Sequence, residues 1–146
     1  MIQNIEFYVG WHSLVKDYAI SGGWTFDGKA LVVCDALGGV YVFDGNSGEL
    51  IWSKTDAHRN GLLATSIHPL QYKFLTTGQD GKILLWETQN KKLEKIINLG
   101  CNWVENASWS VDGDLFAVSS SRKVHVFDKT GDKIWTSDNH KSTISN

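Results

Sequence analysis

Apolar residues in this chain come in short runs that are separated by polar turn residues. Runs such as Leu31-Val-Val33 and Ile83-Leu-Leu85 are β-branched or bulky, which favours strands. The turn dipeptides Asp27-Gly28 and Asp112-Gly113 suit hairpins, because glycine accepts the positive φ that such turns need. No segment keeps an apolar period of 3.6 residues. The pattern therefore predicts an all-β chain with essentially no helix.

The same pattern recurs along the chain at a regular interval. Trp24 to Val33 matches Trp109 to Val118, and Ile67 to Thr76 repeats the pattern midway, so that the leading residues stand 43 and 42 positions apart. Two further sets of segments keep nearly the same period: Val40 to Asp44, Ile83 to Glu87 and Val124 to Asp128, and then Gly48 to Trp52 and Gly131 to Trp135. Three sets in step establish an internal repeat.

Each repeat holds four short apolar runs, which we expect to be four antiparallel strands. Four strands in about 42 residues make one blade of a β-propeller. The expected strands are 18–24, 29–34, 39–43, 49–54, then 62–67, 72–77, 82–86, 93–98, and finally 104–109, 114–119, 123–127, 132–136. The predicted fold is a partial β-propeller of three four-stranded blades, an incomplete ring because closed rings have at least about four.

The repeat divides the chain, residues 1–146, into parts of a single partial propeller. We expect a lone strand at 1–11, blade 1 at 12–56, blade 2 at 57–99, blade 3 at 100–138 and the start of a truncated fourth blade at 139–146. The open sides of blades 1 and 3 would expose apolar faces. Self-association to complete a ring of about six blades is one expected consequence, and aggregation is the other.

The repeat resembles the Trp-Asp (WD) repeat family of propellers. Gly78-Gln-Asp80-Gly-Lys-Ile-Leu-Leu-Trp86-Glu87 is similar to the family's Gly-x-Asp-Gly ending with Trp-Asp, and Ala57-His58 stands where the family has Gly-His. The resemblance implies a buried structural relay of His58, Asp80 and Trp86, with the hydroxyl of Thr76 or of Thr77 between them. Such a relay is favourable when every member is satisfied.

The other two units depart from this pattern. Leu37 stands where blade 1 should have its aspartate, Gly100 stands where blade 3 should have its histidine, and Phe43 and Phe127 replace tryptophan. We expect these blades to depend on apolar packing.

The resemblance also implies a partner-binding rim. In the family, the position six residues before the leading aromatic is a frequent contact site, and here it holds Tyr18, Gly61 and Trp103. Tyr and Trp suit binding because each buries a large area and keeps a polar group. The neighbours expected on the same rim are Glu105, Arg59, Asn60 and Gln79. The alternative is that Trp103 packs beneath a loop.

Composition narrows the function further. A formal charge of −2 and a pI near 6.2 give no electrostatic reason for a nucleic-acid or anionic-membrane partner. No secretory leader and no apolar stretch of membrane-spanning length occurs, so we expect a cytoplasmic protein. The two cysteines, Cys34 and Cys101, lack zinc-site spacing and are expected to be buried strand thiols.

No catalytic or phosphate-binding motif is present, and the five histidines stand at separate repeat positions. We therefore expect a non-enzymatic scaffold that binds a protein, with no cofactor and no metal. Two alternatives stay open. Val42 to Trp52 is similar to the Asp-x-x-Thr-Gly-x-x-x-Trp signature of quinoprotein-type propellers, which bind a quinone cofactor or act in outer-membrane assembly. The chain could also be a truncated remnant without independent function.

Overall fold

A computed structural model describes residues 10–144, and all twelve regular elements in that part of the chain are β-strands. Blade 1 holds β1 (Ala19–Trp24), β2 (Ala30–Asp35), β3 (Val40–Asp44) and β4 (Leu50–Lys54). Blade 2 holds β5 (Leu62–Ile67), β6 (Lys73–Gly78), β7 (Lys82–Glu87) and β8 (Lys92–Asn98). Blade 3 holds β9 (Asn106–Trp109), β10 (Leu115–Ser120), β11 (Lys123–Asp128) and β12 (Lys133–Thr136).

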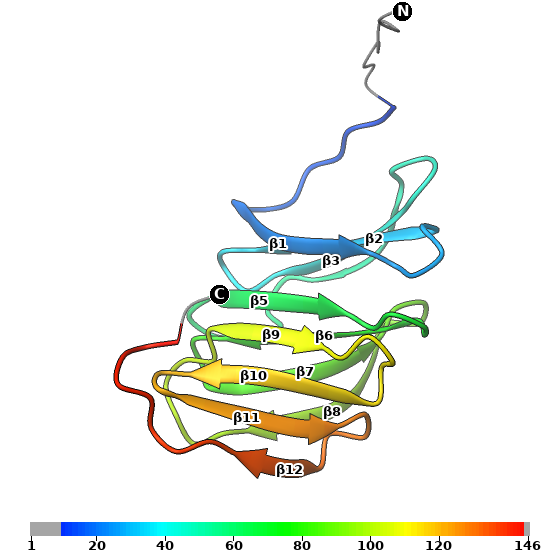
Figure 1. Ribbon diagram of the computed structural model, residues 1–146. Helices are drawn as coiled ribbons and strands as arrows, with labels where there is room; N and C mark the ends of the chain where they lie inside the picture. The colour runs from blue at the N-terminus through cyan, green and yellow to red at the C-terminus, as the bar shows by residue number, and fades with distance from the viewer. Residues whose placement is uncertain (1–9, 145–146) are drawn as a thin grey trace, which may run out of the picture.

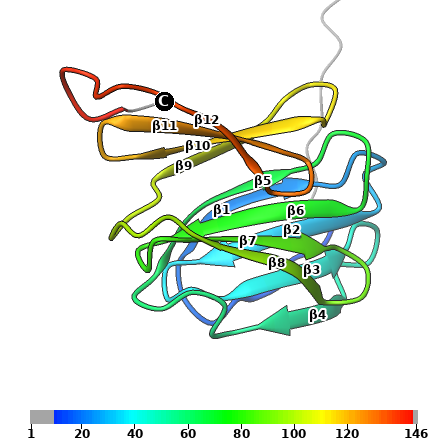
Figure 2. The same ribbon diagram turned by 90° about the horizontal axis from the view of Figure 1, so that it is seen from below.

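Each blade is a separate antiparallel sheet in which the strands lie in chain order. The first strands of the three blades, β1, β5 and β9, lie side by side along one edge of the arc (Figure 1). The blades follow one another without closing a ring, as the turned view also shows (Figure 2). The predicted all-β partial propeller is confirmed, and every strand begins within two residues of its expected position.

The three sheets share an irregularity that the repeat places at matching positions. The register between the third and fourth strands shifts at Val42/Phe43, at Leu85/Trp86 and at Val126/Phe127. A shift of this kind adds twist and bends the edge strand. At this position the structural repeat is therefore the same in all three blades.

Two apolar cores lie between the blades. Alternate residues of β7 serve both of them: Leu84 and Trp86 belong to the core shared with blade 1, whereas Ile83 and Leu85 belong to the core shared with blade 3. All four are buried, because a middle blade is covered on both faces. This double coverage explains the continuous apolar run in the sequence.

A tryptophan from the outermost strand of blade 1 inserts into blade 2. The Trp52 ring lies 6.1 Å from each of the stacked rings of Phe74 and Trp86. Its indole Nε1 donates to the carbonyl of Thr88 at 2.5 Å. We call this place, formed by Phe74, Trp86 and the Thr88 carbonyl, the inter-blade socket.

Blades 1 and 3 each have one face that no other blade covers within residues 10–144. The side chain of Trp24 is 50% exposed on blade 1 and that of Trp135 is 53% exposed on blade 3. The expected lone strand at 1–11 lies outside the described residues except for Gly10 and Trp11, which are not in a strand. A fourth blade was expected to begin at 139–146, and of these residues 139–144 are described and form no strand. The N–H groups of His140 and Ile144 donate to the carbonyls of Arg122 and Ser121 in the β10–β11 turn.

Candidate partner-binding rim

Four side chains of blade 2 form a hydrogen-bonded chain that runs from the core to the surface. The Trp86 Nε1 donates to Thr76 Oγ1 at 3.0 Å, and Thr76 Oγ1 lies 2.9 Å from His58 Nε2. The other ring nitrogen, Nδ1, lies 2.9 Å from Asp80 Oδ1. The structure thus brings His58, Asp80, Trp86 and Thr76 together, and it selects Thr76 as the hydroxyl.

The hydrogen-bond partners of His58 favour one tautomer of its ring. An indole nitrogen can only donate, so the Thr76 hydroxyl accepts from it, and the hydroxyl proton is satisfied when His58 Nε2 accepts it. Nε2 is then unprotonated, and the ring proton on Nδ1 points at the Asp80 carboxylate. Burial lowers the pKa of His58 below its ordinary value, against the opposing effect of Asp80. Burial alone would raise the pKa of Asp80, but hydrogen bonds from His58 and two backbone amides lower it.

Asp80 connects this relay to the loops of the rim. Its Oδ2 accepts the backbone N–H of Arg59 at 3.1 Å, and the Gln79 N–H donates to the Gly61 carbonyl at 3.0 Å. Asn60 and Gly61 both have positive φ, at 65° and 120°. The relay therefore holds the loop that carries Arg59 and Asn60, both of which are exposed.

Blade 1 builds a different buried contact at the same end of its sheet. The predicted position, Leu37, is 60% exposed in the β2–β3 turn. Asp35 takes over instead: its Oδ1 accepts the Gly39 N–H and its Oδ2 accepts the Tyr41 hydroxyl, both at 2.7 Å. Blade 1 therefore adds a buried polar contact to the apolar packing that was expected for it. The signal that sequence reasoning missed is the pair Asp35 and Tyr41 at facing strand ends.

Blade 3 carries a hollow on the same rim. The hollow has a volume of about 450 Å³ and is lined by Cys101, Asn102, Trp103, Glu105, Ser120 and Ser121. The Trp103 carbonyl accepts the Ser120 hydroxyl at 2.8 Å, and the Val104 N–H donates to the Gly78 carbonyl of blade 2 at 3.1 Å. These two bonds fix the loop, while the Trp103 side chain stays 51% exposed.

Glu105 has an unusual position in this hollow. Its Oε2 atom is buried, and among the described residues no donor reaches it. A buried carboxylate oxygen without a donor is unfavourable, and a cation in the hollow would offset the charge of this carboxylate. Trp103 and Glu105 thus bring an exposed aromatic ring and an unsatisfied acid to one hollow.

The remaining predicted rim residues are spread over blades 1 and 2. Tyr18 is 81% exposed on blade 1, and its carbonyl accepts the Ala36 N–H at 2.9 Å. Gln79 is half-buried beside Gly61. The structure therefore groups Arg59, Asn60 and Gln79 on blade 2, and Trp103 with Glu105 on blade 3.

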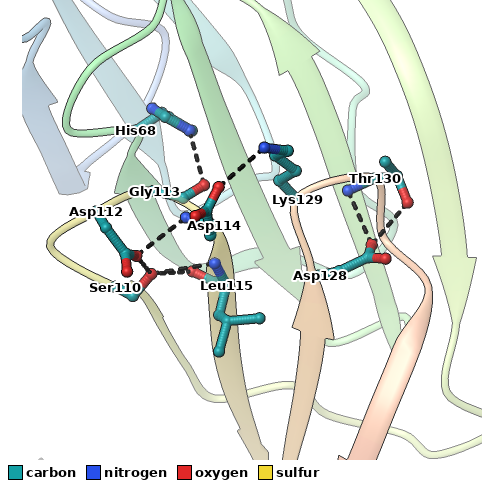
Figure 3. Close-up of polar contacts among 9 residues, drawn as sticks. All are labelled: His68, Ser110, Asp112, Gly113, Asp114, Leu115, Asp128, Lys129 and Thr130. Atoms are coloured by element: carbon teal, nitrogen blue, oxygen red, sulfur yellow. Dashed lines mark hydrogen bonds and ion pairs between the residues drawn. The ribbon is translucent and has the colours of Figure 1, made fainter.

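On the opposite rim, the two turns of blade 3 contain hydrogen bonds among their own polar groups (Figure 3). In the β9–β10 turn, the Ser110 hydroxyl donates to Asp112 at 2.5 Å, and His68 of blade 2 contacts the Gly113 carbonyl at 3.0 Å. Gly113 has a φ of 74°, and a Cβ there would lie 2.3 Å from the His68 ring. Only glycine suits both the turn and the contact.

A second hollow, of about 410 Å³, opens beside these turns between blades 2 and 3. Three of its lining residues are lysines, but each one is paired with an acid. The pairs are Lys73 with Glu94 at 2.9 Å, Lys95 with Asp132 at 2.7 Å and Lys129 with Asp114 at 2.9 Å. The paired charges leave little attraction for an anion.

The residues of the quinoprotein-like signature have structural contacts. Asp44 Oδ1 accepts the N–H groups of Asn46 and Ser47 in the β3–β4 turn, and Trp52 fills the inter-blade socket. Cys34 is buried in β2 as predicted, but the prediction for Cys101 was wrong, because it lies partly exposed in the loop before β9. Solvent reaches Cys101 because this rim loop is less covered by neighbouring blades than β2 is.

Within residues 10–144, no group of His, Cys, Asp and Glu side chains is arranged to hold a metal ion. The same part of the chain contains no helix that could cross a membrane. Comparison with known proteins finds no matching family model and no curated protein with significant similarity.

Proposed function

We propose that this chain is an arc of a WD-repeat-type propeller that acts as a non-enzymatic scaffold and binds a protein partner through its rim. The observation that carries the proposal is the hollow of blade 3, where half-exposed Trp103 and the unsatisfied carboxylate of Glu105 lie together. Residues that dominate protein interfaces are enriched in Trp, Tyr and Arg and lie in pockets that the partner closes.

The chemistry of this hollow favours a basic side chain as the anchor of the partner. A Lys or Arg group over the face of Trp103 gains a cation–π contact. The same cation would lie beside the Glu105 carboxylate, which lines the hollow and has one oxygen without a hydrogen-bond donor among the described residues. We therefore expect the partner to present an exposed Lys or Arg in a short segment.

The WD-type assignment is supported by the His58–Asp80 relay and by the repeat. The relay ties the rim loop of blade 2 to a buried core, so that the loop is held before a partner arrives, and a preformed surface binds with less loss of conformational entropy. Both cysteines are free thiols, which suits a reducing cytoplasm.

The test begins with peptides selected from a random displayed library on the wild-type chain, whose dissociation constants are measured by calorimetry. Trp103→Ala should weaken binding by about thirtyfold, the effect of a loss of about 2 kcal/mol. Glu105→Gln should weaken the same peptides, and selected sequences should share a Lys or Arg whose replacement by Met has a similar effect.

Val111→Ala is the matched control, since Val111 is 93% exposed on the opposite rim. Each variant is first checked for unchanged thermal unfolding. The proposal is wrong if folded Trp103→Ala and Glu105→Gln variants bind the selected peptides as tightly as the Val111→Ala control.

A further inference from the structure

Blade 1 has its own version of the inter-blade socket, and the chain itself fills it. The Trp11 ring lies 6.4 Å from that of Phe43, and its indole Nε1 donates to the Gly45 carbonyl at 3.0 Å. In the repeat, Phe43 and Gly45 match the Trp86 and Thr88 positions that receive Trp52. Trp11 therefore occupies the place of a tryptophan from a preceding blade.

A second contact supports this equivalence. A Cβ on Gly48 would lie 2.5 Å from the Trp11 ring, so the indole rests directly on the β3–β4 turn. At the matching turn of blade 3, a Cβ on Gly131 would lie 2.9 Å from Lys95 of the preceding blade. The Ser13 hydroxyl also donates to the Gly48 carbonyl at 2.5 Å and holds the segment in place.

Blade 3 carries a tryptophan that matches Trp52, but within residues 10–144 no following blade offers it a socket. Trp135 pairs with Val126 in the register in which Trp52 pairs with Val42. Trp52 is buried in blade 2, whereas Trp135 is 53% exposed on the open face of blade 3. A hollow of about 310 Å³ on that blade is lined partly by Ala117 and Val126.

We propose that blade 3 of one copy of this chain docks on blade 1 of a second copy, with Trp135 entering the socket that Trp11 fills in the free chain. The occupant is a second copy because anchor and socket are both on this chain, and Trp11 demonstrates that the socket accepts an indole. One socket cannot hold two indoles, so Trp11 is a cap that competes with association. Two such contacts related by a twofold axis close a ring.

This interface lies on sheet faces and does not use the rim around Trp103, so its test is independent of the test of the proposed function. The experiment is sedimentation velocity over a wide range of protein concentration. Trp11→Ala should associate at least about tenfold more tightly than wild type, since no competing indole is left. Trp135→Ala and the double variant Trp11→Ala/Trp135→Ala should stay monomeric under the conditions in which Trp11→Ala associates.

Val111→Ala is the control, because Val111 is 93% exposed in the β9–β10 turn of the same blade and lies outside β12. It should associate as wild type does. The proposal is overturned if Trp11→Ala associates no more tightly than wild type, or if removing Trp135 leaves its association unchanged.

A second variant covers the case in which Trp11→Ala does not fold. Ser13→Ala removes the bond to the Gly48 carbonyl and leaves the indole, so it should strengthen association in the same direction but less. As the dimer forms, the indole N–H of Trp135 should become protected from exchange and that of Trp11 should lose protection. A dimer in which both indole signals stay unchanged would overturn the proposal.

Discussion

Thr76→Val removes the central hydroxyl of the blade 2 relay while keeping the shape of the side chain. Thr76 is fully buried, accepts from Trp86 Nε1 at 3.0 Å and donates to His58 Nε2 at 2.9 Å. Valine can do neither, so one buried donor and one buried acceptor lose their partners. No cavity forms, because the two side chains have similar volume.

The magnitude follows from these two orphaned groups. Leaving one buried polar group unsatisfied costs about 1–3 kcal/mol, and some relaxation reduces the sum for two. We therefore expect Thr76→Val to lower the free energy of unfolding by about 2–4 kcal/mol. Thr77→Val is the matched control: Thr77 is equally buried, but its hydroxyl has only a 3.5 Å contact with the Ala64 carbonyl. That change should cost less than about 1 kcal/mol.

Urea unfolding at neutral pH, followed by tryptophan fluorescence, measures the difference. An unchanged m-value would show that the midpoints report stability and not a change in the unfolded state. If Thr76→Val is no less stable than Thr77→Val, the relay does not stabilise the fold and the reasoning is refuted.

Three further predictions use the pKa shifts. Burial holds the pKa of His58 below its ordinary value, so the unfolded chain binds the proton before the folded chain does as the pH falls. The free energy of unfolding should therefore keep its full value above about pH 6.5 and decline below it. In a His58→Gln variant, this decline with pH should be smaller. Burial raises the pKa of Cys34 to about 12, so a thiol reagent at pH 8 should label Cys101 first and Cys34 only on unfolding; equal rates would contradict this. The Tyr72 hydroxyl lowers the pKa of Asp27 to about 2, so Tyr72→Phe should raise the value measured by carboxyl NMR titration, and an unchanged value would count against this contact.

The sequence contained most of the fold. The repeat period, the turn dipeptides and the β-branched runs located all twelve strands. Hairpin turns require particular residues and two-sided burial requires apolar runs, so both can be recognised in the local sequence. The middle blade was the clearest, because His58, Asp80 and Trp86 stand in one repeat and the fold only had to bring them together.

What the sequence did not reveal depends on contacts between repeats that have diverged. Asp35 and Tyr41 form their pair two positions from where the repeat pattern placed an acid. The socket contact joins Trp11 and Gly45, which are 34 residues apart in the chain. No local sequence pattern indicates it. Likewise, exposure of Trp103 and the unsatisfied oxygen of Glu105 depend on how the loop before β9 rests on its neighbours.

Hydrogen–deuterium exchange of the chain with and without a selected basic peptide tests the proposed rim most directly. We predict slower exchange at 100–105 and 120–122 when the peptide is bound, with the turns at 110–114 and 128–132 unchanged. Protection of the 110–114 and 128–132 turns, with none around Trp103 and Glu105, would contradict a partner-binding rim at this end of the propeller.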